Sequence, residues 1–328
     1  MSDESFGLGR FESEGKAFLA AVVDEWALPV GSVLEGRDGD VGLNALLGEW
    51  DEHVAALGAA AAQLRADGDG GAALPVEGLR KLIPVQPPQI LLAGMNYRTH
   101  VIDLMVDQKV GSRPDMDLEE IRAETTKMMD DRAKNGLPFV FTGIVSALCG
   151  PEDDIELNAQ SEMNDWELEL AAVIGKPARF VSREEALSYV AGWTIANDLT
   201  SRDLIARPDA GPVGVDWMRS KLHPTHLPVG PNVVPAAFVD DPQALTITLK
   251  LNGEVMQNES TSDMVFDVAR LIEYLSETIQ LLPGDLLLTG SPAGNGTHYG
   301  RFLQDRDLLE GEITGLGTQR NRCVARGR

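Results

Sequence analysis

The sequence predicts an α+β protein in which a small N-terminal α/β unit is followed by a β-rich core. Short apolar runs of strand length recur in the later part of the chain, whereas few stretches carry apolar residues at helical spacing. A polar, glycine-rich break at residues 66–71 and a proline-rich connector at residues 82–89 separate the two parts. We therefore expect a small domain over residues 1–82 and a larger domain over residues 83–328.

The composition limits the possible functions. The chain has 328 residues, of which 43% are hydrophobic, so it can build a full core and is not generally disordered. Its 28 Lys and Arg residues and 51 Asp and Glu residues give a net charge of −23. This charge serves solubility, and it argues against electrostatic binding to nucleic acid or anionic lipid. An anionic substrate would need a local cation, either a metal ion or a basic side chain.

The cysteines and the N-terminus indicate the compartment. Cys149 and Cys323 lie far apart and fit neither a disulfide framework nor zinc-ligand spacing. Residues 1–15 are acidic and lack the apolar centre of a signal peptide. No run approaches the roughly 18 apolar residues of a membrane helix. We therefore expect a cytoplasmic protein that does not bind membranes.

The N-terminal unit contains two expected elements. Residues 18–23 form an apolar run suited to a strand. Residues 41–64 predict a helix, because apolar side chains recur at helical spacing: Leu43, Leu46, Leu47, Trp50, Val54, Leu57 and Ala61. Neither element carries an obvious catalytic group, so we interpret this unit as structural.

The larger domain begins with a buried strand at residues 90–94. Strand-like patterns then recur in four segments, residues 138–143, 144–148, 245–251 and 286–289. A helix is expected over residues 267–281, with its apolar side chains inward: Val268, Leu271, Ile272, Leu275 and Ile279.

Residues 104–137 form a long insertion with an expected helix at residues 117–135. Four methionines lie in or near it, Met105, Met116, Met128 and Met129. Methionine is adaptable packing material, so these residues are interpreted as part of a core. A mobile lid over an apolar substrate tail is the alternative.

Two glutamates lie at strand spacing in the middle of the chain. Residues 165–171 alternate polar or small residues with Trp and Leu, which is the pattern of a half-buried strand. Glu167 and Glu169 then point to one face, roughly 6–7 Å apart. Such a pair repels unless a cation lies between the two carboxylates. A solvated strand face without a function is the alternative interpretation.

A third carboxylate, Asp198, follows one supersecondary unit later. Residues 182–185 resemble a capping box that begins a short helix, Gly192 ends this helix, and residues 193–197 predict a strand. Asp198 lies at the end of that strand, where side chains often line a site. Together with the two glutamates it makes an all-oxygen ligand set, which suits Mg²⁺, Mn²⁺ or Ca²⁺.

Five blocks extend this pattern along the chain. They are GMNYRTH at residues 94–100, WELEL at residues 166–170, YVAGWTIANDLTSRD at residues 189–203, Lys221 with PVGP at residues 228–231, and GDLLLTGSPAG at residues 284–294. In this order they resemble the motifs of the fumarylacetoacetate hydrolase family. The resemblance covers residues 84–323 and extends more weakly over the N-terminal unit.

The resemblance implies a fold and a chemistry. The expected core consists of mixed sheets rolled into a barrel or sandwich with flanking helices, in a homodimer. A divalent metal, Mg²⁺ first and Mn²⁺ or Ca²⁺ as alternatives, is expected on Glu167, Glu169 and Asp198. The implied substrates are β-diketo acids, 2-oxo acids or their enols, with the metal acting as a Lewis acid.

The resemblance also assigns expected roles to single positions. His100 matches the general base that activates water, and Asp103 matches the acid, usually a Glu, that orients it. Taken alone, such a His would be a surface side chain, and an Arg or Lys would form a surface ion pair. Substrate contacts are expected from Tyr97, Arg202, Lys221, Thr289 and Ser291.

Several positions depart from the family pattern. Gly143 replaces a frequent Lys, Ile205 replaces a frequent Gln, and residues 222–224 lack a Ser and an Asp. These changes remove polar contacts, so we expect a larger and less polar substrate than acetylpyruvate. His223 and His226 are additional residues that we expect to face solvent, with substrate contact as the alternative.

Three hypotheses for the function follow. The first is a metal-dependent hydrolase that cleaves a carbon–carbon bond in a 1,3-diketone or acylpyruvate-type substrate. The second is a tautomerase, decarboxylase or hydratase of a 2-oxo acid, which uses the same metal site without an attacking water. The third is a catalytically silent, metal-stabilised dimer with an interaction role.

Overall fold

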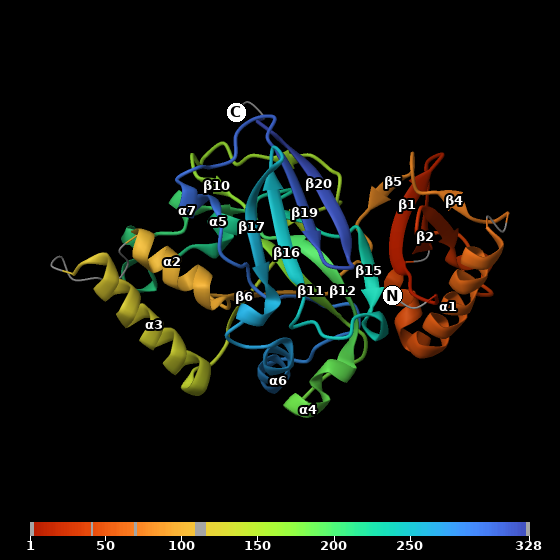
Figure 1. Ribbon diagram of the computed structural model, residues 1–328, viewed down its shortest axis with the longest axis horizontal. Helices are drawn as coiled ribbons and strands as arrows, with labels where there is room; N and C mark the ends of the chain where they lie inside the picture. Colours follow the sequence, from red (N-terminus) through yellow and green to blue (C-terminus); the bar gives the residue numbers. More distant parts are fainter. Residues whose placement is uncertain (1–2, 41, 69–70, 109–115, 326–328) are drawn as a thin grey trace.

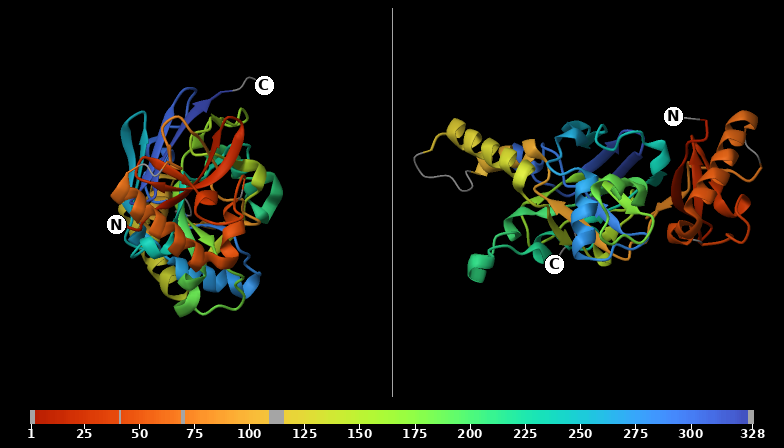
Figure 2. Two further views of the ribbon diagram at one scale, coloured as in Figure 1. Left: turned by 90° about the vertical axis from the view of Figure 1, so that its right-hand side faces the viewer. Right: turned by 90° about the horizontal axis from the view of Figure 1, so that it is seen from below.

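The computed structural model describes residues 3–40, 42–68, 71–108 and 116–325. A sheet-rich body forms the centre of the molecule (Figure 1). The N-terminal residues form a lobe at one end, and the helices α2 (Arg98–Gln108) and α3 (Leu118–Asn135) lie at the other end (Figure 2). The mixture of large sheets and separate helices confirms the predicted α+β class.

One large sheet runs from the N-terminal lobe through the centre of the protein. Within the described residues its eleven strands are β1 (Gly7–Ser13), β2 (Lys16–Val23), β3 (Trp26–Pro29), β4 (Leu74–Pro75), β5 (Arg80–Leu82), β6 (Ile90–Gly94), β7 (Phe139–Thr142), β11 (Leu168–Ile174), β12 (Val190–Asn197), β15 (Asn232–Pro235) and β18 (Leu286–Leu288). Their order is β4-β3-β2-β1-β15-β12-β11-β18-β6-β7, with β5 paired to β1. This order is an open path, so the described strands form layers and not a closed barrel.

A second sheet covers the centre of the first (Figure 1). Its strand order is β17 (Glu254–Ser260), β16 (Thr246–Leu251), β19 (Leu308–Ile313), β20 (Gly317–Val324) and β9 (Ile155–Glu156). Leu168 and Leu170 of β11 belong to one buried cluster with Ile247 and Leu249 of β16 and Leu309 of β19. The two sheets are therefore held together mainly by apolar side chains.

The central position of β11 changes one expectation. This strand pairs with β12 on one side and β18 on the other, and every residue from Leu168 to Ile174 is buried. The alternation at residues 165–171 predicted one solvated face, which is wrong. The second sheet covers one face, and Ala171 and Val173 pack on the other face with the N-terminal lobe.

The N-terminal lobe is continuous with the large sheet. β1 pairs with β15, with Leu8 opposite Val233, and Leu57 of α1 (Trp50–Asp67) shares a buried cluster with Leu286. The strand predicted at residues 18–23 is confirmed as β2. The segment 41–64 forms a 3₁₀ helix over Leu43–Glu49 before α1, and residue 41 lies outside the described residues. The division at residue 82 remains a prediction about independent folding.

The insertion forms a helical hairpin of α2 and α3. The expected helix at residues 117–135 is confirmed, and Asp117 caps it in a capping box with Glu120. Arg98 of α2 is paired with Asp130 of α3 at 2.9 Å. Met129 is fully buried between the helices, so it acts as packing material. Met128 is exposed.

Short elements complete the fold. The remaining strands are β8 (Leu148–Cys149), β10 (Asn164–Asp165), β13 (Thr200–Ser201) and β14 (Leu227–Pro228). The other α-helices are α4 (Arg183–Ala186), α5 (Trp217–Lys221), α6 (Val268–Thr278) and α7 (Gly296–Tyr299). The 3₁₀ segments besides Leu43–Glu49 are Val30–Ser32, Val145–Ala147, Leu187–Tyr189, Arg202–Leu204, Pro208–Val213, Ala236–Phe238 and Thr261–Asp263.

Several local expectations were wrong. Ser182 begins α4 without a side-chain hydrogen bond to the backbone, so the expected capping box is not formed. Gly192 lies inside β12 and does not end a helix. Glycine is needed there because a Cβ atom would lie 2.5 Å from the Val234 carbonyl oxygen of β15. Residues 144–148 contain a 3₁₀ turn in place of a strand. The helix expected at residues 267–281 ends at Thr278.

Helix length and polarity bear on membrane insertion. None of the helices in the described part of the chain is long and apolar enough to cross a bilayer.

Candidate active site

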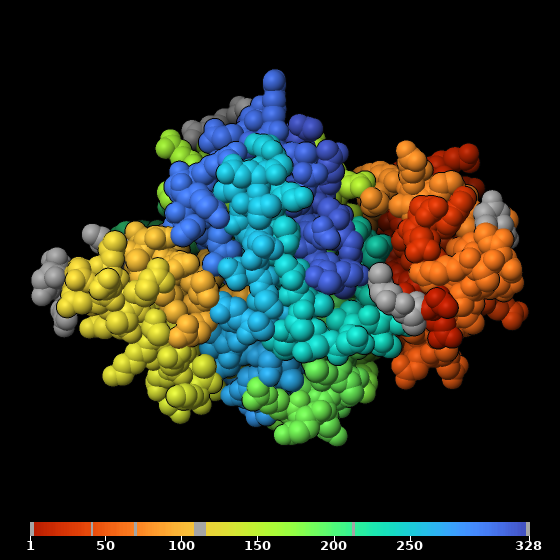
Figure 3. Space-filling model, in the orientation of Figure 1, coloured from red at the N-terminus to blue at the C-terminus, as the bar shows by residue number. Residues whose placement is uncertain are grey.

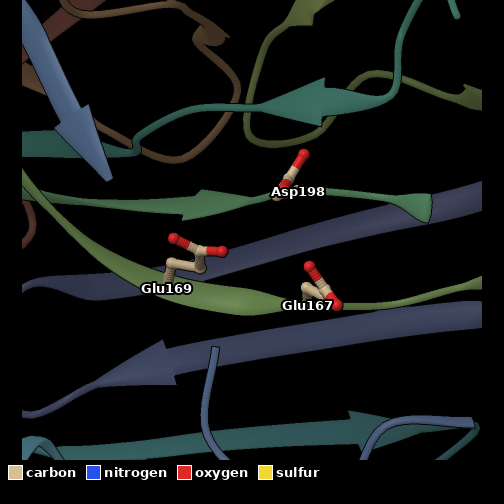
Figure 4. A group of neighbouring side chains, drawn as sticks. All are labelled: Glu167, Glu169 and Asp198. Carbon is tan, nitrogen blue, oxygen red and sulfur yellow. The ribbon is translucent and has the colours of Figure 1, made fainter. Parts of the chain in front are cut away.

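Three carboxylates converge where β11 and β12 run side by side (Figure 4). Ligand oxygens of Glu167, Glu169 and Asp198 lie within 4.8 Å of one another, and all three side chains are buried. Glu167 immediately precedes β11 and Asp198 immediately follows β12. The Asp198 amide donates to the Glu167 carbonyl oxygen at 2.9 Å, so backbone pairing fixes the spacing of these two side chains.

Lys221 lies against two of these carboxylates. Its Nζ donates to Glu167 Oε2 at 2.7 Å, to Thr200 Oγ1 at 2.8 Å and to Asp198 Oδ2. Burial alone would lower the pKa of Lys221, but the charges of Asp198 and Glu167 outweigh burial and raise it. Lys221 is therefore a charged ammonium group held inside the site.

Arg202 forms a second cationic group beside Glu167. Its Nε donates to Asp165 Oδ2 at 2.8 Å, and its terminal nitrogen forms an ion pair with Glu167 Oε1 at 2.6 Å. Asp165 is fully buried and also accepts the Gly296 amide, at 2.6 Å, from the start of α7. Asp165 thus links the guanidinium group to the loop that begins α7.

The charges of this site do not balance. When all four buried carboxylates, Asp165, Glu167, Glu169 and Asp198, are ionised, they face two cations, Arg202 and Lys221, and two negative charges are in excess. Burial, together with Asp198 and Glu167, raises the pKa of Glu169 well above its usual range. Burial also raises the pKa of Asp198 to about 6. A divalent cation would neutralise this excess, and hard oxygen ligands suit Mg²⁺, Mn²⁺ or Ca²⁺.

Glu167 differs from its neighbours because both cations contact it. Burial acts to raise its pKa, but the charges of Arg202 and Lys221 outweigh burial and hold the pKa well below the usual range. Glu169 instead receives a backbone hydrogen bond from the Gly290 amide at 2.7 Å. The Thr-Gly-Ser turn that was expected to reach the site therefore orients a candidate metal ligand through its backbone.

His100 lies in the first turns of α2 and lines the same cavity as the three carboxylates. Burial lowers the pKa of His100 to about 4, even though the Glu167 charge acts in the opposite direction. The imidazole is therefore neutral near pH 7, which is the form that can accept a proton.

Asp103 and His100 line different cavities. The Asp103 carboxylate accepts a hydrogen bond from Arg122 of α3 at 3.0 Å. It lines a separate surface pocket of about 280 Å³ together with Glu259 and His298. The packing of α3 against α2 therefore pairs Asp103 with Arg122, and Asp103 does not line the cavity of the three carboxylates.

The other expected substrate contacts divide between the cavity and the layer beneath it. Ser291 lines the cavity and accepts a hydrogen bond from Gln257 Nε2 at 3.0 Å. Thr289 is buried and its Oγ1 donates to the Leu170 carbonyl oxygen at 2.9 Å. Tyr97 is fully buried, and burial raises the pKa of its hydroxyl group. Thr289 and Tyr97 are thus both buried outside the lining of the cavity, so neither is placed to contact a substrate there.

The cavity contains side chains that the sequence interpretation did not assign to the site. It has a volume of about 270 Å³ and includes an apolar set, Leu104, Phe139, Phe141, Ile205 and Trp217. In the sequence, the apolar character of this lining was indicated by the departure from the family pattern at Ile205. Phe141 and Trp217 come from distant parts of the chain, so no local pattern could link them.

One expectation about the histidines was wrong. His226 is fully buried, and its Nε2 lies 3.1 Å from the Glu156 carbonyl oxygen. Its ring centroid lies 4.7 Å from that of His223, which is partly exposed. His226 therefore packs beneath the loop that follows Lys221 and does not face solvent.

The site thus combines three buried carboxylates that could hold a metal ion with a layered α+β fold. Residues 89–324 match the family model described as Fumarylacetoacetate (FAA) hydrolase C-terminal. The chain therefore belongs to the fumarylacetoacetate hydrolase family, as its motifs predicted.

Relatives within the family have different activities. The chain is 36% identical over 271 residues to a 2,4-didehydro-3-deoxy-L-rhamnonate hydrolase of Sphingomonas sp. (strain SKA58), with 81% of each chain covered. It is 34% identical over 254 residues to the mitochondrial oxaloacetate tautomerase FAHD2A of Bos taurus, with 76% of this chain and 71% of the other covered. The family membership thus includes both hydrolases and tautomerases.

Solved structures are similar over most of the chain. A fumarylacetoacetate hydrolase from the psychrophilic Exiguobacterium antarcticum has a TM-score of 0.75 and 28% identity, covering 98% of this chain and 100% of the other. A fumarylpyruvate hydrolase from Pseudomonas aeruginosa, in complex with Mn²⁺ and pyruvate, has a TM-score of 0.58 and 26% identity, covering 75% and 92%. The latter shows that a related fold binds a divalent metal and a 2-oxo acid.

Proposed function

We propose that this protein is a metal-dependent hydrolase that cleaves a carbon–carbon bond in a β-diketo acid of the acylpyruvate type. The observation that carries the proposal is one cavity that holds three buried carboxylates with an unbalanced charge and a neutral histidine. A relative of 36% identity that is named a hydrolase also supports it.

Glu167, Glu169 and Asp198 hold the divalent metal in this proposal, because their oxygens converge and carry the excess charge. When bound, the metal supplies Lewis acidity toward the 2-oxo and carboxylate oxygens of the substrate. Lys221 and Arg202 orient the ligand carboxylates through their ion pairs and place positive charge beside the substrate carboxylate. The side chains of Glu167, Arg202 and Lys221 are buried, which strengthens these ionic interactions.

His100 acts as the general base. It takes a proton from a water molecule as the water oxygen attacks the acyl carbonyl carbon. The bond between that carbon and the adjacent methylene carbon breaks, and its electron pair remains on the methylene carbon, which then takes up a proton. One water is consumed, and the products are a carboxylic acid and pyruvate.

Asp103 has a conditional role in this proposal. In the structure one of its carboxylate oxygens accepts a hydrogen bond from Arg122, so orienting His100 requires a different conformation of the Asp103 side chain or the use of its second oxygen. His100 and Asp103 both lie on α2 and are three residues apart, so a change in the side-chain conformation of Asp103 is enough to bring the acid to the base.

The test compares the rates at which the metal-loaded wild-type protein and the metal-loaded His100→Ala variant turn over acylpyruvates. Loss of the enol absorbance with formation of two fragments is expected for the wild type, and loss of turnover for the variant. The thermal shift on adding Mn²⁺ should be the same for both proteins, because His100 is not a proposed ligand. Unchanged turnover in His100→Ala would remove its role as base.

Tautomerisation of a 2-oxo acid is the second candidate. The pairing of Asp103 with Arg122 favours it, because enolisation needs a proton shuttle but no activated water. A relative of 34% identity is named an oxaloacetate tautomerase. A product of unchanged mass would select this function over hydrolysis.

Three finer properties belong to the same proposal. We propose Mg²⁺ as the metal used in the cell, a homodimer as the assembly and the cytoplasm as the location. Sedimentation of the purified protein tests the dimer, and metal analysis of protein purified without added metal tests Mg²⁺ against Mn²⁺ and Ca²⁺.

A further inference from the structure

The cavity has two chemically different sides. Its ionic side consists of Glu167, Glu169, Asp198, Arg202 and Lys221. Its apolar side consists of Leu104, Phe139, Phe141, Ile205 and Trp217. The volume of about 270 Å³ lies near the lower end of the range for small-molecule pockets. A ligand that binds on the ionic side therefore has its remaining atoms close to the apolar side.

Three aromatic rings form most of this apolar side. Phe141 and Trp217 are stacked, with ring centroids 5.2 Å apart and planes at 15°. Phe139 lies 6.2 Å from Trp217 and 6.4 Å from Phe141. Phe139 is 43% exposed, so part of its ring is free to contact another molecule. We call these three residues the aromatic wall.

The neighbouring strand leaves room for the wall. Phe139 and Phe141 are two residues apart on β7, so they project from the same face. Gly94 of β6 pairs with Phe139, and a Cβ atom at Gly94 would lie 2.9 Å from the Phe139 ring. Any larger residue at this position would displace the ring.

The aromatic wall begins directly beside the ionic side. The Nζ atom of Lys221 lies 5.6 Å from the centroid of Phe141. Lys221 in turn donates to Glu167 and Asp198. When the oxo-acid end of a substrate lies at the carboxylate site, the rest of the substrate therefore contacts the aromatic wall.

The described residues that line the cavity offer no unpaired cation for a second acidic group. Among the described residues that line it, the cations are Arg202 and Lys221, and both are already paired with carboxylates. A carboxylate at the far end of a substrate would lose its hydration against Ile205 and the rings without gaining a free cationic partner among these residues. The cavity is therefore unsuited to dicarboxylate substrates.

We propose that the aromatic wall of Phe139, Phe141 and Trp217 binds the acyl group of the substrate, and that this group is uncharged and apolar, either an alkyl chain or a phenyl ring. The proposal rests on the β-diketo acid function given above and adds the substrate class to it. Apolar contact with aromatic faces supplies the specificity.

Binding measurements test the proposal independently of catalysis. Phenylpyruvate, pyruvate and oxaloacetate are titrated into the Mn²⁺-loaded protein in a calorimeter. Phenylpyruvate should bind about tenfold or more tightly than pyruvate, because its ring contacts the wall, and also more tightly than oxaloacetate. Trp217→Ala and the half-exposed Phe139→Ala should each remove most of this preference for phenylpyruvate, while leaving pyruvate binding within about threefold.

Phe180→Ala is the matched control, because Phe180 is 70% exposed, lies against Arg179 and is not part of the cavity. It should leave all three affinities unchanged.

Ile205→Arg supplies a cation on the apolar side and should reverse the order, so that oxaloacetate binds better than phenylpyruvate. Oxaloacetate binding as tightly as phenylpyruvate in the wild type, an unchanged preference in both wall variants, or no binding of any of the three acids would overturn the proposal. Selective binding of phenylpyruvate without any acylpyruvate cleavage would refute the hydrolase function alone.

Discussion

Asp263 accepts two hydrogen bonds from Thr99, the residue immediately before His100 in the chain. The Thr99 amide donates to Asp263 Oδ2 at 2.8 Å, and its Oγ1 donates to Asp263 Oδ1 at 3.2 Å. A carboxylate at this place satisfies free amide groups of the first turn of α2 and favours its dipole. Asp263 therefore positions the helix turn that carries the proposed base.

Asp263→Ala should lower kcat by about tenfold or more and leave KM and the Mn²⁺-induced thermal shift nearly unchanged, because the metal ligands do not contact Asp263. Asp263→Asn retains an acceptor oxygen and should recover part of the rate. Steady-state kinetics on an acylpyruvate measures both variants. An equal fall in kcat for Asn and Ala, or a loss of metal binding, would contradict a positioning role.

Lys221→Met should destabilise the metal-free protein by about 3–5 kcal/mol at pH 8, because it leaves Glu167 and Asp198 buried without their shared cation. Urea unfolding in the presence of a chelator measures this loss. Lys250→Met is the matched control, since Lys250 is exposed on β16. Equal stability of the two variants would show that the buried ammonium group is dispensable.

Glu169→Gln should abolish most of the rise in melting temperature that Mn²⁺ gives the wild type, because it removes one of three converging ligand oxygens. The metal-free variant should be at least as stable as the wild type, since burial beside Asp198 and Glu167 disfavours the charged form of Glu169. Calorimetric melting with and without Mn²⁺ gives both values. Glu162→Gln, on the surface, is the control. A normal thermal shift in Glu169→Gln would refute the ligand assignment.

His226 should make the protein less stable in acid. Burial and the neighbouring His223 lower the pKa of His226 to about 3, from about 6.5 in the unfolded chain. The unfolded state therefore binds more protons between these two values, so the free energy of unfolding falls as the pH drops from about 6.5 toward 3. His226→Gln removes the titrating group while retaining a hydrogen-bond donor, and its unfolding free energy should fall less over this range, by about a few kcal/mol. Parallel profiles for wild type and variant, from urea unfolding at pH 7 and pH 4.5, would contradict this account.

The sequence predicted that the carboxylates of Glu167 and Glu169 lie close together, because residues two apart on a strand share a face. Asp198 comes 31 residues after Glu167, so its position beside the two glutamates depends on the antiparallel pairing of β11 with β12. The burial of β11 on both faces was not predictable in this way, since it depends on a second sheet whose strands, apart from β9, come from residues after 245. The same limit applies to His226, whose burial depends on contact with Glu156.

The parts of the site that the sequence did not predict join distant segments. Asp165 was one polar residue in an alternating pattern, and its role becomes visible only when Arg202 and the start of α7 meet it. The aromatic wall joins β7 to α5. Asp103 stands three residues after His100, as the motif requires, yet the packing of α3 pairs it with Arg122.

Hydrolysis of a carbon–carbon bond changes the mass of the substrate, and mass analysis of the products therefore distinguishes it from tautomerisation. Benzoylpyruvate is incubated with the Mn²⁺-loaded protein, and all products are identified by mass. The account predicts benzoate and pyruvate, whose masses sum to those of the substrate and one water. Loss of the enol absorbance with no change in mass would contradict hydrolysis and assign the carboxylate site to tautomerisation.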